Sequence, residues 1–89
     1  MKQYFISDEE IFEVRKDNIE VINILLEKFS NILDEVYKKF KFFGKEFFLQ
    51  IERKVIKSIC LTHQGYNKDS NSVIKDFVKY TNNFLLVHL

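Results

Sequence analysis

The fold is decided by the stretch INILLEKFSNILDEVYKKFKFFG, which covers residues 22–44. Its apolar side chains recur in alternating steps of four and three residues, and this spacing places them on one face of an α-helix. They are Ile22, Leu26, Phe29, Leu33, Val36, Phe40 and Phe43. Leu25 and Ile32 widen this face enough for it to contact more than one neighbouring helix. The pattern predicts an amphipathic helix over about residues 18–43.

Gly44 predicts the end of this helix. Lysines crowd the residues before it, and both positive charge and a following glycine are favoured at a helix C-terminus. A second apolar stripe begins after it, rotated by roughly 100° from the first on one helical wheel. Its members are Phe48, Ile51, Val55, Ile59 and Cys60. A turn followed by a helix over residues 45–63 is therefore the simpler interpretation, and one long helix over residues 18–63 in a coiled-coil dimer is the alternative.

The N-terminal segment predicts a short helix near residues 8–16. Ser7 and Glu10 have the spacing of a capping box, in which each residue satisfies a backbone N–H of the other. Asp17 and Glu20 provide signals for a second helix start, so we expect a break after the first helix.

The C-terminal third predicts a polar loop over residues 66–72 and a last helix over 72–88. Only Gln3–Ile6 has an extended pattern. The expected fold class is all-α, a small antiparallel helical bundle of three longer helices and a short N-terminal helix, in a single domain over residues 1–89. The predicted core adds Phe47, Ile51, Val55, Ile59, Ile74, Phe77, Phe84 and Leu85 to the first stripe.

The composition places the chain among globular proteins and excludes several classes. It has 89 residues, of which 46% are hydrophobic and 30% charged, and its single cysteine cannot form an internal disulfide. No apolar run approaches the roughly 20 residues of a membrane span, and no secretory signal is present, so a cytoplasmic protein is expected. Phe, Ile, Lys, Asn and Tyr supply 43 residues, which indicates an AT-rich genome such as that of a low-GC bacterium, its phages, or a comparable virus or parasite.

The charges are segregated along the chain. Residues 1–36 carry a net charge of −5 and residues 37–63 a net charge of +5. A basic segment rich in phenylalanine is typical of surfaces that bind phosphates and unpaired bases, although Glu46 and Glu52 interrupt it and the isoelectric point is only 7.8. The candidate residues for binding a partner or a nucleic acid are Lys38, Lys39, Lys41, Lys45, Arg53, Lys54 and Lys57.

Several apolar side chains fall outside the predicted stripes. So many unassigned apolar residues on a small chain indicate a second contact surface, and we expect self-association. The candidate interface residues are Ile24, Phe42, Leu49, Ile56, Leu86 and Val87.

No motif for catalysis, metal or a cofactor is complete. Cys60 and His63 are three residues apart, but a zinc site needs four ligands and the chain has no second cysteine. Two glycines are too few for a phosphate-binding loop. We expect a small non-enzymatic protein-binding module, such as an inhibitor, adaptor or assembly factor, that needs no cofactor and acts as a homo-oligomer. The alternative is binding of a nucleic acid or an anionic nucleotide-like ligand by residues 38–57.

Overall fold

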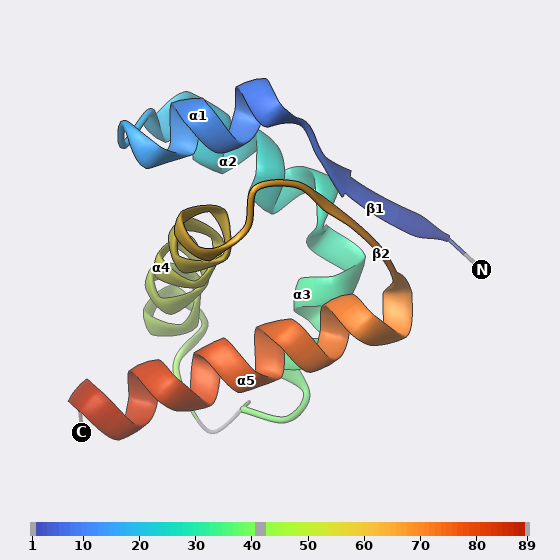
Figure 1. Cartoon of the computed structure of the whole chain (residues 1–89). Coiled ribbons are helices and arrows are strands. Elements are labelled where there is room, and N and C mark those ends of the chain that lie inside the picture. Colours follow the sequence, from blue (N-terminus) through green and yellow to red (C-terminus); the bar gives the residue numbers. More distant parts are fainter. Residues whose placement is uncertain (1, 41–42, 89) are drawn as a thin grey trace.

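The computed structural model describes residues 2–40 and 43–88. Within these ranges the chain forms five helices and one two-stranded antiparallel sheet (Figure 1). The predominantly helical fold predicted from the sequence is confirmed. The elements are β1 (Gln3–Ile6), α1 (Asp8–Arg15), α2 (Ile19–Lys28), α3 (Ser30–Tyr37), α4 (Lys45–Thr62), β2 (Tyr66–Asp69) and α5 (Ser70–His88).

Both predicted helix starts in the N-terminal part are present. The Ser7 hydroxyl accepts from the Glu10 N–H at 3.1 Å, and the Glu10 carboxylate accepts from the Ser7 N–H at 2.9 Å, so the capping box is complete. The break after α1 is confirmed, because Asp17 has a φ of 63° in the left-handed region. The cap of α2 is nevertheless Asn18 and not Asp17, since the Asn18 side chain accepts from the Glu20 N–H at 3.1 Å.

The predicted helix over residues 18–43 is divided in two. Phe29 separates α2 from α3 with φ −97° and ψ 14°, and α3 ends at Tyr37. The break has a packing reason: α2 lies against α1 and α4, whereas α3 lies against α5. The alternative of one helix over residues 18–63 is wrong, because α3 ends eight positions before α4 begins at Lys45.

The sheet joins the N-terminus to the segment before α5. Tyr66 pairs with Ile6 and Asp69 with Gln3, so the extended pattern predicted for Gln3–Ile6 is confirmed. The prediction of a loop over residues 66–72 is wrong, because β2 occupies residues 66–69 and α5 begins at Ser70. A four-residue strand is too short for its alternating pattern to be recognised among polar residues.

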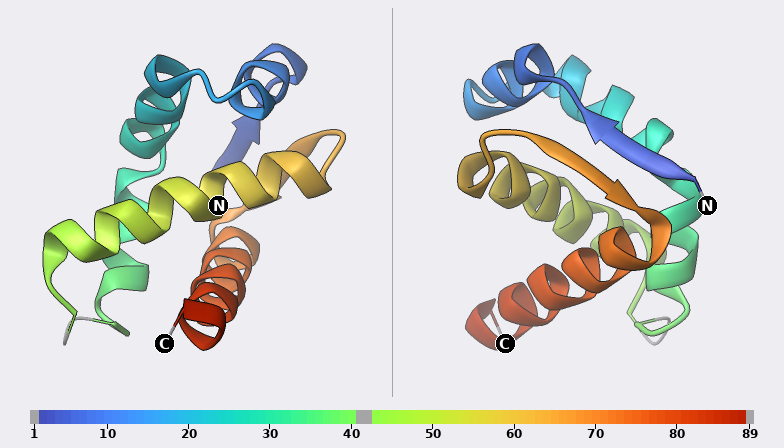
Figure 2. Two further views of the ribbon diagram at one scale, coloured as in Figure 1. Left: turned by 90° about the vertical axis from the view of Figure 1, so that its left-hand side faces the viewer. Right: turned by 45° about the vertical axis from the view of Figure 1, so that its right-hand side comes forward.

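The longer helices cross each other. α4 passes over α2 and α5 instead of running alongside them, and the two strands lie beside its C-terminal end (Figure 2). The expected antiparallel bundle is therefore not confirmed.

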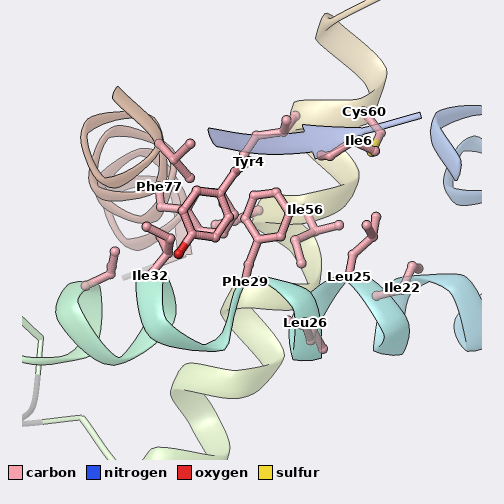
Figure 3. Packing of buried hydrophobic residues seen from close by; sticks show 14 of the residues in the cluster. Tyr4, Ile6, Ile22, Leu25, Leu26, Phe29, Ile32, Ile56, Cys60 and Phe77 are labelled. Atoms are coloured by element: carbon pink, nitrogen blue, oxygen red, sulfur yellow. The ribbon is translucent and has the colours of Figure 1, made fainter. Parts of the chain in front are cut away.

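Aromatic rings from distant segments form the centre of the core (Figure 3). The Phe29 ring lies 5.2 Å from that of Tyr4, 5.6 Å from that of Phe77 and 6.4 Å from that of Tyr66. Because these rings come from β1, β2, α5 and the α2–α3 junction, they connect the sheet to the helices.

Most of the predicted core is buried, with corrections at five positions. Phe47 is 42% exposed and is not a core residue. Leu33, Phe43, Ile74 and Phe84 are only partly buried and pack against the core from outside. The core members that were not assigned from the sequence include Tyr4, Ile6 and Tyr66.

Candidate functional site

The structure distributes the predicted basic residues over separate places. Lys39, in the turn after α3, lines a shallow hollow together with Lys75 and Lys79 of α5. Lys45, at the start of α4, lines a different cavity. Lys41 lies outside the described residues. Lys39 and Lys45 thus line different hollows, and two lysines of α5 that the sequence did not single out lie beside Lys39.

Two other members of the basic set have acidic partners. Lys38 forms an ion pair with Glu35 at 3.0 Å. Lys57 forms an ion pair with Asp17 and so connects α4 to the α1–α2 turn. These partners reduce the positive charge that a phosphate would meet. The remaining predicted basic residues on α4 are Arg53, which is half-buried, and Lys54, which is exposed.

The candidate interface residues have different exposures. Ile24, Leu49, Leu86 and Val87 are exposed, with Leu86 at 82% and Val87 at 76%. Ile56 is 1% exposed and belongs to the core, so its assignment to an interface is wrong. It lies one residue from Val55 and four from Cys60, on the face of α4 that contacts the other helices, and the predicted stripe was drawn too narrowly to include it. Phe42 lies outside the described residues.

A cavity of about 220 Å³ lies between the α2–α3 segment and α4. Both sides contribute residues at helical spacing, so each side presents a single face to it. The lining is mostly apolar, which is typical of small-molecule sites. The α2–α3 segment contributes Leu26, Ser30, Leu33, Asp34 and Tyr37, and α4 contributes Lys45, Phe48, Leu49 and Glu52.

Glu52 is the unusual member of this lining because its side chain is 0% exposed. One carboxyl oxygen, Oε1, accepts a hydrogen bond from the Thr81 hydroxyl of α5 at 2.9 Å. The other, Oε2, has no hydrogen-bond partner among the described residues. Burial raises the pKa of Glu52 to about 7, and the Thr81 hydrogen bond opposes this rise only in part.

Sequence reasoning missed this carboxyl and placed Glu52 on the exposed basic face. A signal for the correct placement was present, since Glu52 lies four residues after Phe48, three before Val55 and seven before Ile59. All three are buried, and a residue at these spacings shares their face. Glutamate is rarely buried, which favoured an exposed Glu52, whereas the helical spacing favoured a buried one. The spacing gave the correct placement.

Cys60 and His63 do not form a reactive pair. Cys60 is fully buried, and burial raises the pKa of its thiol to about 11, so the thiolate needed for nucleophilic attack is disfavoured at neutral pH. The Nδ1 atom of His63 lies 2.8 Å from the carbonyl oxygen of Ile59. Arg15 donates to the carbonyls of Cys60 and His63 at 2.8 and 2.9 Å, and it thereby stabilises the end of α4.

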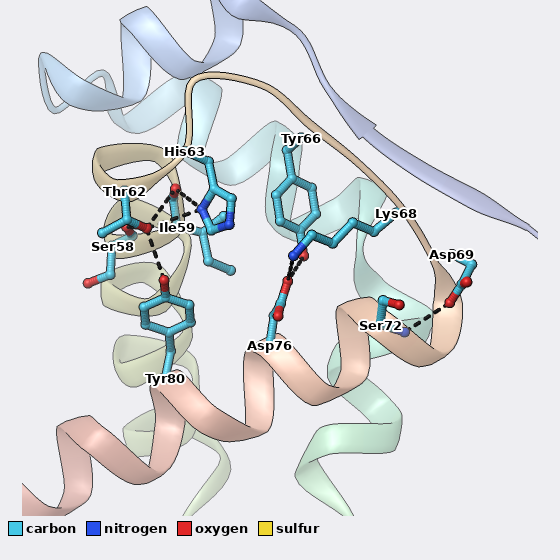
Figure 4. A network of polar contacts seen from close by, with 10 residues as sticks. All are labelled: Ser58, Ile59, Thr62, His63, Tyr66, Lys68, Asp69, Ser72, Asp76 and Tyr80. Atoms are coloured by element: carbon cyan, nitrogen blue, oxygen red, sulfur yellow. Dashed lines mark hydrogen bonds and ion pairs between the residues drawn. The ribbon is translucent and has the colours of Figure 1, made fainter.

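Polar side chains between α4, β2 and α5 form contacts that hold these elements together (Figure 4). The hydroxyl groups of Thr62 and Tyr80 lie 2.9 Å apart and connect α4 to α5. Tyr66 and Lys68 both donate to the same oxygen of Asp76, at 2.7 and 2.9 Å, and connect β2 to α5. Burial and the Asp76 carboxylate raise the pKa of Tyr66. These groups are mutually satisfied, which indicates a structural role.

Residues 2–40 and 43–88 contain neither a metal-binding cluster nor a helix that could span a membrane. No group of three or more histidine, cysteine, aspartate or glutamate residues in these ranges is arranged to hold a metal ion. None of the helices there has the length and apolar character that crossing a membrane requires. Comparison of the chain with protein-family models, curated proteins and solved structures finds no match.

Proposed function

We propose that this protein is a non-enzymatic protein-binding module that acts as a homodimer, with the two copies joined through the C-terminal part of α5. The observation that supports this proposal is the exposure of Leu86 and Val87, which exceeds that of every other large apolar side chain in the described ranges. Both lie near the end of α5, at the periphery of the molecule (Figures 1 and 2). Exposed apolar side chains at a periphery are typical of contact surfaces.

A second copy is the proposed occupant because the surface has a hollow next to its projecting side chains. The hollow is about 250 Å³ and is lined by Ser58, Tyr80, Asn83, Phe84 and Val87. In a two-fold symmetric pair the same patch meets itself, so the projecting part of each copy faces the hollow of the other. Leu86, next to Val87 in the chain, is the side chain we assign to the partner's hollow. Each surface outside the interface is then present twice in the dimer, so the dimer can contact a partner at two points. This suits an inhibitor, adaptor or assembly factor.

Replacing Leu86 or Val87 with aspartate is expected to convert the dimer to a monomer. The reason is that an unpaired carboxylate in an apolar interface loses its hydration without compensation. Light scattering coupled to size-exclusion chromatography, at tens of micromolar protein, should give twice the chain mass for the wild type and the chain mass for each variant. Asn71→Asp, which adds the same charge at an exposed position in the first turn of α5, far from Leu86 and Val87, is the control and should remain dimeric. A wild-type protein that stays monomeric under these conditions contradicts the proposal.

The second candidate function is binding of a nucleic acid or an anionic nucleotide-like ligand. It is favoured by the hollow of about 460 Å³ in which Lys39 meets Lys75 and Lys79. The hollow also contains Ile74 and Val78, and apolar surface beside lysines suits a ligand that has phosphates and a flat ring. Lys75 also interacts electrostatically with Asp69, so Lys39 and Lys79 are the better positions to test.

For this candidate, Lys39→Glu and Lys79→Glu are each expected to weaken binding of a single-stranded oligonucleotide by roughly tenfold or more, because each replaces attraction to phosphate with repulsion. Fluorescence anisotropy at low and at moderate salt measures the effect, and wild-type affinity should fall as salt rises. Lys54→Glu makes the same charge change at an exposed position on α4 and should bind like the wild type. Failure of the wild type to bind at low salt, or an equal loss in Lys54→Glu, removes this candidate.

A further inference from the structure

We propose that the cavity between the α2–α3 segment and α4 binds a small primary ammonium compound with a short apolar body, and that the Glu52 carboxylate is its counter-ion. This ligand site is separate from the proposed contact surface at the end of α5. It rests on three features: Glu52 lines the cavity and has a buried carboxyl oxygen without a partner among the described residues, two aromatic rings line the cavity, and the lining is mostly apolar.

The carboxyl oxygen of Glu52 determines the chemical class of the ligand. Thr81 holds Oε1 at 2.9 Å and so fixes the orientation of the group, while Oε2 has no partner among the described residues. A carboxylate only accepts hydrogen bonds, and leaving one of its oxygens buried without a donor is unfavourable. A primary ammonium brings both a positive charge and three N–H donors, so it compensates the charge and satisfies the oxygen together.

The walls of the cavity fit the rest of such a ligand. The rings of Tyr37 and Phe48 lie 4.8 Å apart in an edge-on arrangement, and both line the cavity. Aromatic faces attract cations, and apolar side chains suit a hydrocarbon body. The side chains that would contact that body are Leu26, Leu33 and Leu49. A volume of about 220 Å³ limits the ligand to a small molecule, of about the size of one substituted ring.

The charges around the cavity favour a cation over an anion. Asp34 and Lys45, the other charged residues of the lining, are both exposed and have opposite signs. Their contributions largely cancel and are weakened by solvent, so the buried Glu52 carboxylate dominates inside the cavity. Tyr37 is the remaining ionisable group of the lining.

Binding must also depend on pH, because the proton and the ammonium compete for the same carboxylate. Burial holds the pKa of Glu52 at about 7. The ionised fraction that can pair with an ammonium then rises about tenfold between pH 6 and pH 8, and the apparent affinity rises by the same factor. An uncharged ligand that accepts a hydrogen bond from protonated Glu52 would show the opposite trend.

The experiment is an NMR titration with benzylamine, with benzyl alcohol as the uncharged ligand of similar shape. We expect benzylamine at millimolar concentration to shift resonances of Leu26, Leu33 and Leu49, with roughly tenfold weaker binding at pH 6 than at pH 8. Glu52→Gln keeps the size and the hydrogen bond to Thr81 but removes the charge, and it should lose benzylamine binding. Glu46→Gln removes an exposed charge from the same helix and should bind like the wild type.

A further variant tests the position of the site without changing Glu52. Leu49→Trp places a larger side chain in the cavity lining and should also lose benzylamine binding while its circular dichroism spectrum stays helical. The proposal is overturned if wild-type protein does not bind benzylamine at pH 8. It is equally overturned if benzyl alcohol binds as strongly, or if Glu52→Gln keeps the wild-type affinity.

Discussion

Replacing Phe29 with alanine is expected to lower the free energy of unfolding by about 3–5 kcal/mol. Phe29 is 1% exposed, and its ring lies next to the rings of Tyr4 and Phe77 (Figure 3). The Tyr66 ring lies 6.4 Å from it on centroids. The substitution removes a large buried ring and leaves a cavity where the two strands, α5 and the α2–α3 junction meet. Because small domains have only about 5–15 kcal/mol of stability, this loss is a large part of the total.

Urea unfolding followed by circular dichroism measures this difference. Phe12→Ala is the matched control, because Phe12 is 59% exposed and the same atoms are removed from the surface of α1. We expect the control to change the stability by less than about 1 kcal/mol. Similar effects of the two substitutions would show that Phe29 is not at the centre of the core.

The second large effect is a dependence of stability on pH that comes from Glu52. Burial raises its pKa from an ordinary value of 4.5 to about 7, so the folded state binds the proton more tightly than the unfolded state. The stabilisation that comes from proton binding by Glu52 is fully present below the pKa of Glu52 in the unfolded state. It is lost as the pH rises through the pKa of Glu52 in the folded state. Between pH 4.5 and somewhat above pH 7, wild-type protein should lose about 3 kcal/mol of stability relative to Glu52→Gln.

Comparison with Glu52→Gln separates this effect from that of other carboxyls. Burial raises the pKa of Glu10, but hydrogen bonds from Ser7 and the interaction with Lys28 outweigh it and leave the pKa lowered, so Glu10 contributes stability that is lost as pH falls. This contribution is the same in both proteins and cancels in their difference. Urea unfolding at pH 5, 6, 7 and 8 measures that difference. A difference between wild type and Glu52→Gln that stays constant with pH contradicts the prediction.

The helices could be predicted from the sequence where local signals were strong. The capping box at Ser7 and the apolar stripe of α4 are short-range patterns. The prediction that Gly44 ends the preceding helix is wrong, because α3 ends at Tyr37 and Gly44 is the N-cap of α4. The break at Phe29 follows instead from tertiary packing, because α2 and α3 contact different neighbours and a continuous heptad pattern cannot show this. The pairing of β1 with β2 joins residues 60 or more positions apart, and no local signal specifies it.

The candidate sites were harder to predict because they depend on how helices cross. The exposure of Leu86 and Val87 could be predicted, because side chains outside the apolar face of a helix tend to be exposed. The hollow with Lys39 needs α5 beside α3, and the cavity with Glu52 needs α4 beside the α2–α3 segment. Glu52 itself was misplaced because its charge was given more weight than its position among buried neighbours, and its partner Thr81 is 29 residues away.

The pH dependence of stability and the proposed ammonium site both require that the Glu52 carboxyl lies in the protein interior. The most direct test is an NMR titration of the glutamate side-chain carboxyl carbons in ¹³C-labelled protein, with Glu52 assigned by its disappearance in Glu52→Gln. We predict a midpoint near pH 7 for Glu52, well above the ordinary glutamate value of 4.5. A Glu52 midpoint near 4.5, the ordinary value for a solvated glutamate, would contradict the buried placement and both consequences drawn from it.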